Sequence, residues 1–351
     1  MKFSCIVFIR HKFQLKFRRT RNLNLTDEAI RLTYKLKDTR GWKLSNARKK
    51  LSEDCEWNSY YQKMLYRPFD IRTIYYSDKM VDWSRRDVMR HIMQDEKNIA
   101  MIVPRQYKEE PGAFVTKNII GHKTVSAYDI NYLFPLYLFP QKEEGNKKPN
   151  STIMMVFEPR PSYGRKPNIA SIIFEKIEAA FKKRPTPEDI LYYIYGIFYS
   201  NIYRETYAEF LKIDFPRVLF TADYKIFLKM GKLGNELVKL HLLKSPALDP
   251  PIAKYPIIRG DDRIEKIVYD GDRQRIYINQ DKYFEGIASE VWNYHIGGYQ
   301  VLNKYLKDRK GRIMDDAPTY CRIITALSKT IEIQKKIDAI YPELEKEIIC
   351  F

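Results

Sequence analysis

Hydrophobic and polar positions divide the chain into segments with different predicted structures. In residues 1–20, apolar and basic side chains alternate between Phe3 and Phe17, which predicts one or two strands. Residues 26–63 instead show helical spacing, and Thr26 precedes two acids in the manner of a helix N-cap. The chain is therefore expected to open with strand and then helix.

From Tyr66 onward the pattern changes to short strands. Residues 141–151, QKEEGNKKPNS, are predicted to form a polar loop or hairpin end. One short helix is expected at SRRDVMRHIM. The segments expected to form strands are YRPFDIRTIYYS, NIAMIVPRQ, GAFVTKNII and YLFPLYLFP.

Helical patterns return in the second half of the chain. Thr186, followed by Pro187 and two acids, marks a helix start, and the apolar residues beyond it nearly encircle the axis, which predicts a buried helix. A second helix is expected at roughly 223–243, an Asp-Gly turn at 270–272 predicts a hairpin, and residues 318–348 have helical spacing. The chain is therefore expected to adopt a mixed α/β (α+β) fold.

The charge of the chain points to a polyanionic partner. The 351 residues carry a formal net charge of +18, and residues 1–50 contain fifteen Lys and Arg against three acids. Such a field attracts nucleic acid first and an anionic membrane surface second. Tyrosines beside these cations suit nucleic acid because phenol rings bond phosphates and stack on bases, although most of the rings are expected to fill the core.

The cysteines and the hydropathy pattern favour a cytoplasmic protein. No Cys-x-x-Cys pair occurs, so no zinc site is expected, and a disulfide framework is not expected in a chain of this length. No apolar run reaches 18 residues, which predicts no membrane span. The four cysteines are Cys5, Cys55, Cys321 and Cys350.

No catalytic centre is predicted. Residues 249–252, Asp-Pro-Pro-Ile, approach the acid-or-amide, Pro-Pro, aromatic motif of amino-methylating enzymes, but Ile252 cannot stack on a flipped base. Glycine-rich turns for a nucleoside cofactor or for nucleotide phosphates are missing, as is a His-Glu-x-x-His motif. We therefore expect a proline-rich loop here, no cofactor or metal bound by the chain itself, and no catalysis by the chain alone.

Several basic segments could contact nucleic acid. In YRPFDIRTIYY, Arg67 and Arg72 are candidate phosphate ligands, while Asp70 is expected to form an Arg–Asp pair that braces the turn. On the helix expected at SRRDVMRHIM, Arg86 and Arg90 share one face, which could be a phosphate clamp or a solvated face.

A further basic segment, YHIGGYQVLNKYLKDRKGR, combines a glycine pair with a cluster of cations. Gly297 and Gly298 allow the backbone to approach a neighbouring element closely. The cations that follow are expected to bind DNA phosphates, which position a protein without choosing its sequence. They are Lys304, Lys307, Arg309, Lys310 and Arg312.

The segments VPRQ and FVTKNIIGHKTVS provide side chains suited to the recognition of base edges. Gln and Asn can bond adenine edges through two hydrogen bonds, and Arg or Lys can bond guanine. A strand and loop rich in these residue types suits a groove of duplex DNA. The base-reading candidates are Arg105, Gln106, Lys117, Asn118, His122 and Lys123.

Five blocks of the sequence resemble a known family and follow its order. They resemble the C-terminal specificity (target-recognition) region of type ISP and type IIG single-polypeptide restriction–modification enzymes, which are built around an adenine-specific DNA methyltransferase. The resemblance runs from about Thr26 to Ile340. The blocks are LYRPFDIRTIYYSDKMVDWSRRDVMRHI, NIAMIVPRQ, FVTKNIIGHKTVSAYDINYLFPLYLFP, TPEDILYYIYGIFYSNIYRETYAEFLKIDFPRVLFT and VWNYHIGGYQVLNKYLKDRKGR.

The resemblance implies a division of the chain. Residues 1–65 would be a basic N-terminal strand and helical linker, 66–317 a DNA target-recognition domain with inserted helices near 186–243, and 318–351 a C-terminal helix. The first 19 residues are not expected to match the family.

The resemblance also implies a function for this region. In that family this region follows the methyltransferase core and recognises duplex DNA while the core flips and methylates an adenine with S-adenosylmethionine. The Asn-Pro-Pro-Tyr, cofactor, helicase and nuclease motifs of the full enzymes do not occur in this sequence. S-adenosylmethionine, and Mg and ATP for restriction, would therefore act only through a core supplied in trans or formerly in cis.

Three hypotheses follow for the function. The first is a sequence-specific duplex DNA recognition module without methyltransferase, helicase or nuclease activity of its own. The second is a subunit of a split adenine-specific DNA methyltransferase or restriction enzyme that is active only with a partner chain. The third is a structural role, in which the basic residues 1–50 serve to dock the core.

Overall fold

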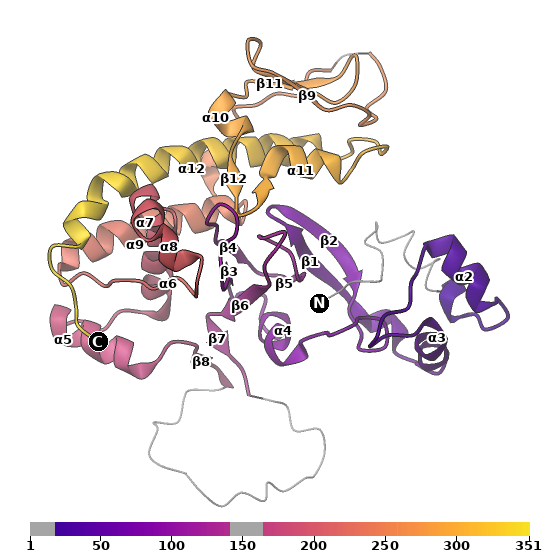
Figure 1. The fold of residues 1–351 in the computed structure, drawn as a ribbon, viewed down its shortest axis with the longest axis horizontal. Coiled ribbons are helices and arrows are strands. Elements are labelled where there is room, and N and C mark those ends of the chain that lie inside the picture. The colour runs from indigo at the N-terminus through magenta and orange to yellow at the C-terminus, as the bar shows by residue number, and fades with distance from the viewer. Residues whose placement is uncertain (1–17, 141–163, 258) are drawn as a thin grey trace, which may run out of the picture.

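The computed structural model describes residues 18–140, 164–257 and 259–351. Within these residues, helices and small sheets pack together in a mixed α+β fold, as the sequence predicts (Figure 1). The polar loop predicted at 141–151 lies outside the described residues. None of the helices in the described part of the chain is both long and apolar enough to cross a bilayer.

The N-terminal part of the chain corrects one prediction. Residues 18–21 are helical, which contradicts the strand predicted for 1–20; residues 1–17 lie outside the described residues. The physical reason is Arg48, whose side chain is only 2% exposed and bonds to carbonyl groups of the segment before the first complete helix, so that this backbone turns instead of extending. Its partners are the carbonyls of Thr20, Asn22 and Leu25 and the carboxylate of Asp27.

Two helices form a small unit beside the first sheet, at the right of Figure 1. The side chain of Thr26 accepts a hydrogen bond from the Ala29 N–H and caps the first helix, as predicted. The unit has its own apolar cluster, which includes Trp42, Leu44 and Tyr75. Its elements are α2 (Asp27–Tyr34), α3 (Leu44–Ser52) and η1 (Trp57–Tyr60).

Short strands follow, but the first begins at Tyr61, inside the region 26–63 that the sequence predicts to be helical, because residues 61–63 pair with β2. One sheet has the order β2-β1-β5 and another the order β4-β3-β6, while β7 pairs with β8. All these pairs are antiparallel except β1 with β5. The elements are β1 (Tyr61–Arg67), β2 (Asp70–Tyr75), α4 (Arg86–Met93), β3 (Ala100–Pro104), β4 (Phe114–Thr116), β5 (Ile119–Ile120), β6 (Asn131–Pro135), β7 (Tyr137–Leu138) and β8 (Lys166–Pro167).

The central helices pack at very short range. The side chain of Thr186 and that of Asp189 form a capping box at the predicted start of α6. Glycine at 234 allows α9 to touch α6, since a Cβ there would lie 1.8 Å from the Tyr192 carbonyl oxygen. The helices are α5 (Ser171–Phe181), α6 (Pro187–Phe198), α7 (Asn201–Thr206), α8 (Ala208–Leu211) and α9 (Tyr224–His241).

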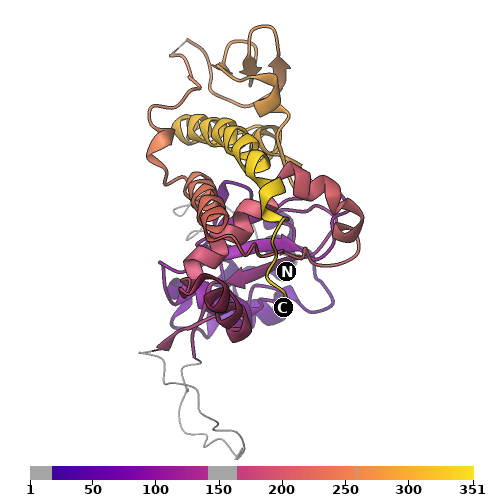
Figure 2. The same cartoon turned by 90° about the vertical axis from the view of Figure 1, so that its left-hand side faces the viewer.

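The C-terminal part carries the predicted hairpin and a long helix. The sheet β11-β10-β9 stands above α12, which lies between it and the body of the molecule (Figures 1 and 2). The predicted turn at 270–272 joins β9 to β10. The elements are η3 (Pro246–Leu248), β9 (Val268–Asp270), β10 (Arg275–Tyr277), β11 (Tyr283–Glu285), α10 (Ser289–Trp292), β12 (His295–Ile296), β13 (Tyr299–Gln300), α11 (Val301–Lys307) and α12 (Ala317–Leu344).

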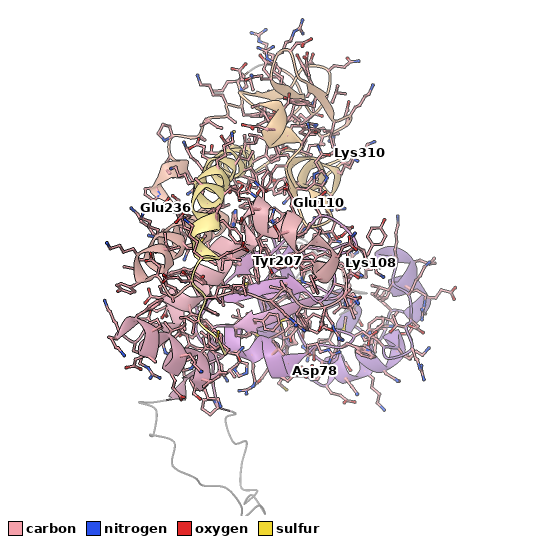
Figure 3. All side chains as sticks on the ribbon, turned by 60° about the vertical axis from the view of Figure 1, so that its left-hand side comes forward. Asp78, Lys108, Glu110, Tyr207, Glu236 and Lys310 are labelled. Atoms are coloured by element: carbon pink, nitrogen blue, oxygen red, sulfur yellow. The ribbon has the colours of Figure 1, made fainter. Side chains whose placement is uncertain are left out.

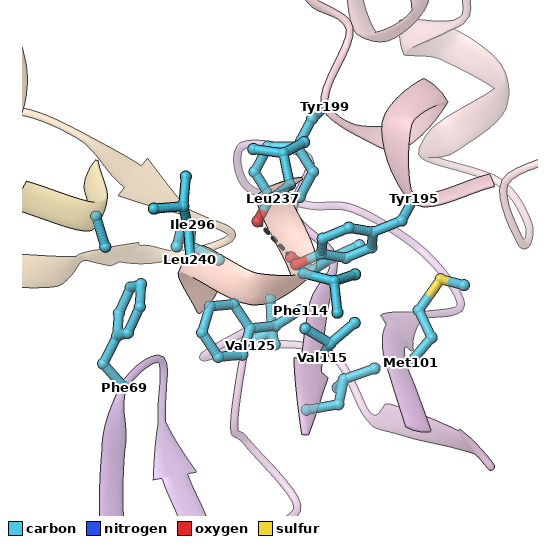
Figure 4. Close-up of a cluster of buried hydrophobic side chains, with 14 of the residues drawn as sticks. Phe69, Met101, Phe114, Val115, Val125, Tyr195, Tyr199, Leu237, Leu240 and Ile296 are labelled. Atoms are coloured by element: carbon cyan, nitrogen blue, oxygen red, sulfur yellow. Dashed lines mark hydrogen bonds between the residues drawn. The ribbon is translucent and has the colours of Figure 1, made fainter. Parts of the chain in front are cut away.

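A single large core joins strands and helices from distant parts of the chain. Figure 4 shows Phe69 and Phe114 from the strand region facing Leu240 from α9 and Ile296 from the C-terminal part. The core cluster extends in sequence from Met64 to Ile349 and includes α12. The proposed boundaries at 65/66 and 317/318 stay predictions.

Candidate nucleic-acid interface

Three segments that are distant in the sequence meet beside β12 and β13. The Gly298 N–H donates to the Val125 carbonyl at 3.1 Å. The carbonyl of Lys123 accepts two hydrogen bonds, from the Tyr299 hydroxyl at 2.8 Å and from the Arg67 guanidinium at 2.6 Å. The structure therefore brings the turn after β1, the loop around Lys123 and the glycine-pair segment into one surface region.

The glycine pair makes this meeting possible. Gly297 has a φ of +57°, and a Cβ there would lie 2.2 Å from the Val125 carbonyl oxygen. A Cβ on Gly298 would lie 2.0 Å from the Glu109 carboxylate, and one on Gly112 would lie 2.1 Å from the Gly297 nitrogen. The close backbone approach is thus to the chain's own loops, and it fixes the base of the segment that carries the cations.

Two cations of the basic segment, Lys304 and Arg309, form ion pairs within the protein. Asp70 is 1% exposed and accepts from Arg72 at 2.6 Å and from Arg309 at 2.8 Å. Lys304 pairs with Asp308 at 2.6 Å. Burial raises the pKa of Asp70, but the hydrogen bonds and charges of Arg72 and Arg309 outweigh it and hold this pKa below its usual value. Asp70 thus braces the turn, as expected, through Arg72 and Arg309.

Three arginines of this region also pack on aromatic rings, and one of them is Arg72, which lies 3.9 Å from the centroid of the Tyr66 ring. The Arg309 guanidinium lies 3.5 Å from the centroid of the Tyr305 ring, and that of Arg67 lies between the rings of Tyr66 at 4.1 Å and Tyr299 at 4.8 Å. These tyrosines were not singled out in the sequence, where they only add to a general abundance of rings. Their contacts hold the three arginines against the protein surface.

The cations that remain at the surface lie at the end of α11. Lys307, Lys310 and Arg312 are exposed, and no ion pair involves Lys307 or Lys310 among the described residues. We call these three residues the basic fork. Figure 3 shows Lys310 near the end of α11, with Lys108 and Glu110 of the neighbouring loop below it.

The remaining phosphate candidates, Arg86 and Arg90, lie on α4 and have different partners. Arg86 pairs with Asp78 at 3.2 Å, and both side chains are about half exposed. Arg90 donates to the carbonyls of Phe139 and Pro140 at 2.8 and 3.0 Å. Arg90 therefore ties α4 to the chain after β7, which leaves Arg86 as the outward-facing member of the pair.

The base-reading candidates do not form one cluster. Arg105 pairs with Asp214 at 2.9 Å, and the Gln106 side chain donates to the Ile213 carbonyl at 2.8 Å. Both residues therefore lie against the segment after α8.

The other four candidates flank β5 on its two sides. Lys117 and Asn118 precede this strand and line a cleft with the end of α9. His122 and Lys123 follow it, are half-buried, and lie in the surface region that contains the glycine pair. Lys123 donates to the Tyr128 carbonyl. Among the base-reading candidates, His122 and Lys123 are thus the ones that the structure joins to the glycine-pair segment.

The potential metal-ligating side chains of the described residues are dispersed. No group of three or more His, Cys, Asp and Glu side chains in the described part could hold a metal ion. The Asp-Pro-Pro-Ile segment packs on α12, where Asp249 pairs with Arg322 at 3.4 Å and the Ile252 N–H donates to Thr325 at 3.0 Å. Its polar groups therefore hold a loop in place.

Several solved structures of similar fold contain DNA or a DNA substrate mimic. The chain aligns with an ATP-dependent type ISP restriction–modification enzyme, LlaBIII, bound to DNA, with a TM-score of 0.67 and 18% identity over 94% of this chain and 22% of that chain. It also aligns with a nuclease-deletion mutant of the type ISP restriction–modification enzyme LlaGI in complex with a DNA substrate mimic. The TM-score is 0.59 and the identity 18%, over 93% of this chain and 30% of that chain. The chain also aligns with a DrdV–DNA complex, with a TM-score of 0.64 and 19% identity, over 96% of this chain and 33% of that chain.

A family match covers nearly the whole chain. No curated protein matches the sequence. The model of the type ISP C-terminal specificity domain matches residues 5–336, which corrects the expectation that the first 19 residues lie outside the family. The chain spans only 22–33% of the length of the solved enzymes above. This protein belongs to the type ISP C-terminal specificity domain family.

Proposed function

We propose that this chain recognises a specific sequence in duplex DNA as the specificity module of a restriction–modification system. The observation that carries the proposal is the family match over residues 5–336, which is joined by the shared fold of enzymes solved with DNA. A formal net charge of +18 supports it, because a field of that sign draws the chain to phosphates. Such a module would work in the cytoplasm, on the cell's own or incoming DNA.

The surface proposed to meet the duplex combines the basic fork with the loop at His122 and Lys123. Lys307, Lys310 and Arg312 would contact phosphates and set the position of the module on the duplex. His122 and Lys123, beside the glycine pair, would reach base edges, since imidazole and ammonium groups can bond purine acceptors in the major groove. Arg309 would support this surface from beneath through its pair with Asp70.

Methylation and restriction would belong to a core outside the matched region. We propose that this core binds S-adenosylmethionine, and Mg and ATP for restriction, and that it joins the module either within a longer chain or as a partner. The module itself would then contribute recognition and no chemical step.

The first experiment is selection of a randomised duplex DNA pool by the purified chain near physiological salt. We expect enrichment of a short asymmetric motif. A scrambled duplex of equal length is the control, and it should bind more weakly by a margin that grows with salt, because non-specific binding rests on phosphate contacts. Failure to retain any duplex, with and without an added methyltransferase core, would overturn the proposal.

A second candidate function is that of a subunit of a split adenine-specific methyltransferase. The observation that favours it is the match to the type ISP specificity domain, because the solved structures of similar fold include a restriction–modification enzyme. Transfer of labelled methyl groups to a duplex should then require this chain together with a methyltransferase core. Equal methylation by the core alone would exclude this candidate.

A further inference from the structure

A cleft of about 550 Å³ lies between the β2-β1-β5 sheet and the C-terminal end of α9, at the opposite side of β5 from His122 and Lys123. Its inner wall is apolar and includes the buried side chains of Leu65, Phe69 and Phe114. Ile71 also lines it and is 50% exposed. The cleft is within the size range of sites that hold small molecules, and its apolar wall suits a planar ring.

Three lysines from distant parts of the sequence line this cleft, and the first of them is Lys63 of β1. Lys117 comes from the turn between β4 and β5, and Lys244 follows the end of α9. Both side chains line the cleft. Burial lowers the pKa of Lys117, and the charge of Lys244 lowers it further. Two like charges held together destabilise each other, and an anion between them would remove that cost.

The charge of Asp95 raises the pKa of Lys117, but its carboxylate is too distant to form an ion pair with this lysine. No ion pair joins Lys117 or Lys244 to a carboxylate among the described residues. Glu96 lines the cleft, but it meets Lys117 through its backbone carbonyl, at a long 3.4 Å, as does Lys97. The lysine pair therefore has the charge for an anion and only weak internal partners.

We infer that this cleft binds a nucleotide, with its phosphate between Lys117 and Lys244 and its base against the apolar wall. The polar side chains of Gln62 and Asn118 also line the cleft and can bond ring nitrogens or exocyclic groups. This inference goes beyond the proposed function, since a duplex-recognition surface at the basic fork needs no such site. The nucleotide could be free in solution or part of a DNA strand, and both share the same phosphate-and-ring chemistry.

The test is titration of the full chain with AMP, followed by calorimetry, beside adenosine and inorganic phosphate. We expect AMP to bind on the order of tenfold more tightly than adenosine or phosphate, because each of these retains only half of the contacts. Lys244→Glu should weaken AMP binding on the order of tenfold or more, since it replaces attraction by repulsion at an exposed position. Lys229→Ala, at an exposed position of α9 outside the cleft, is the matched control and should leave the affinity unchanged.

A second variant tests the cleft independently of the lysines, in case Lys244→Glu does not fold. Ile71→Glu places a negative charge in the cleft from an exposed strand position and should also weaken AMP binding, with the unfolding midpoint as a check on folding. If AMP does not bind the folded wild-type chain, or binds Lys244→Glu and wild type equally, the inference is wrong.

Competition with duplex or single-stranded DNA identifies the source of the nucleotide. Displacement of AMP by DNA would support a strand nucleotide, and simultaneous binding of both would support a free one. Failure of the inference stays separate from failure of the proposed function, because retention of duplex DNA by the wild-type chain is measured independently of AMP.

Discussion

Arg309 and Asp70, 239 residues apart in the sequence, form an ion pair of 2.8 Å that joins α11 to the start of β2. Asp70 is 1% exposed and the Arg309 side chain 18% exposed, so the pair is shielded from solvent. Arg72 donates to the second carboxylate oxygen of Asp70 at 2.6 Å. The basic segment is therefore anchored at its own centre, and the anchor orients the fork residues on either side of Arg309.

Asp70→Asn should destabilise the protein by about 3–5 kcal/mol, because it leaves Arg309 without its buried counter-charge and Arg72 with only the more distant Asp308. Urea unfolding at pH 7 would measure this. The control is Asp261→Asn, since Asp261 and Arg263 form an exposed pair, and its removal should cost less than about 1 kcal/mol. Equal effects of the two changes would show that the network at Asp70 adds no stability.

The same pair gives a defined pH dependence. The pKa of folded Asp70 lies below its value of about 3.9 in an unfolded chain, so its stabilising contribution is fully present above that pH. The contribution is lost as pH falls through the lower, folded pKa. The difference in unfolding free energy between wild type and Asp70→Asn should therefore be constant from pH 7 to about pH 5 and shrink at more acid pH.

His241 should make the core sensitive to moderate acid. Burial, and to a smaller extent the charge of Arg204, lowers the pKa of His241 to about 3, and its ring nitrogens bond Tyr195 at 2.6 Å and Thr330 at 3.0 Å. The neutral ring is thus favoured by folding, and this stability is present above an unfolded pKa of about 6.5 and lost as pH falls toward 3.

Protonation linked to His241 should lower the free energy of unfolding by roughly 2 kcal/mol at pH 5. The decrease is about 1.4 kcal/mol for each pH unit below 6.5. Urea unfolding at pH 7, 6 and 5 would show it as a slope. His241→Gln, which cannot take up a proton in this range, should have a flatter slope whatever its stability at pH 7. Parallel slopes in the two proteins would contradict a neutral buried His241.

Lys307→Ala combined with Lys310→Ala should weaken binding to all duplexes alike. Each phosphate contact contributes about 0.9 to the slope of log affinity against log salt, so the loss of two should reduce that slope by roughly 1.8. Arg309 is left intact because its removal would disturb Asp70. Lys225→Ala with Lys229→Ala, which removes two exposed lysines of α9, is the charge-matched control. An unchanged slope in the fork variant would exclude the fork from the phosphate contacts.

Gly297→Ala should destabilise the chain more than Gly311→Ala. Both glycines have positive φ, at +57° and +79°, so both changes carry a backbone cost of about 1 kcal/mol. Only at Gly297 would the Cβ collide, since it would lie 2.2 Å from the Val125 carbonyl oxygen, whereas at Gly311 nothing lies within 4 Å. Thermal unfolding compares the two, and Gly297→Ala should also reduce sequence preference by displacing the loop at Lys123. Equal stability of the two variants would mean that the approach to Val125 is easily relaxed.

Local signals in the sequence were enough to locate most elements. The caps at Thr26 and Thr186, the Asp-Gly turn at 270–272 and the apolar repeat of the C-terminal helix all act within a few residues, so their outcome hardly depends on the rest of the chain. The family, too, was visible in the order of the sequence blocks. The strand predicted over residues 18–20 failed because Arg48, far along the chain, bonds that backbone in a turn.

The roles of the cations were decided only by tertiary structure. The sequence alone made Arg72, Arg90 and Arg309 candidates equal to Lys307 and Lys310, since charge is all that a basic segment displays. Packing set them apart, because it brought Asp70 to two arginines and two backbone carbonyls to Arg90, while it left the fork lysines at the surface. A cation's function depends on which acceptors reach it, and those acceptors come from chain segments that only the folded core assembles.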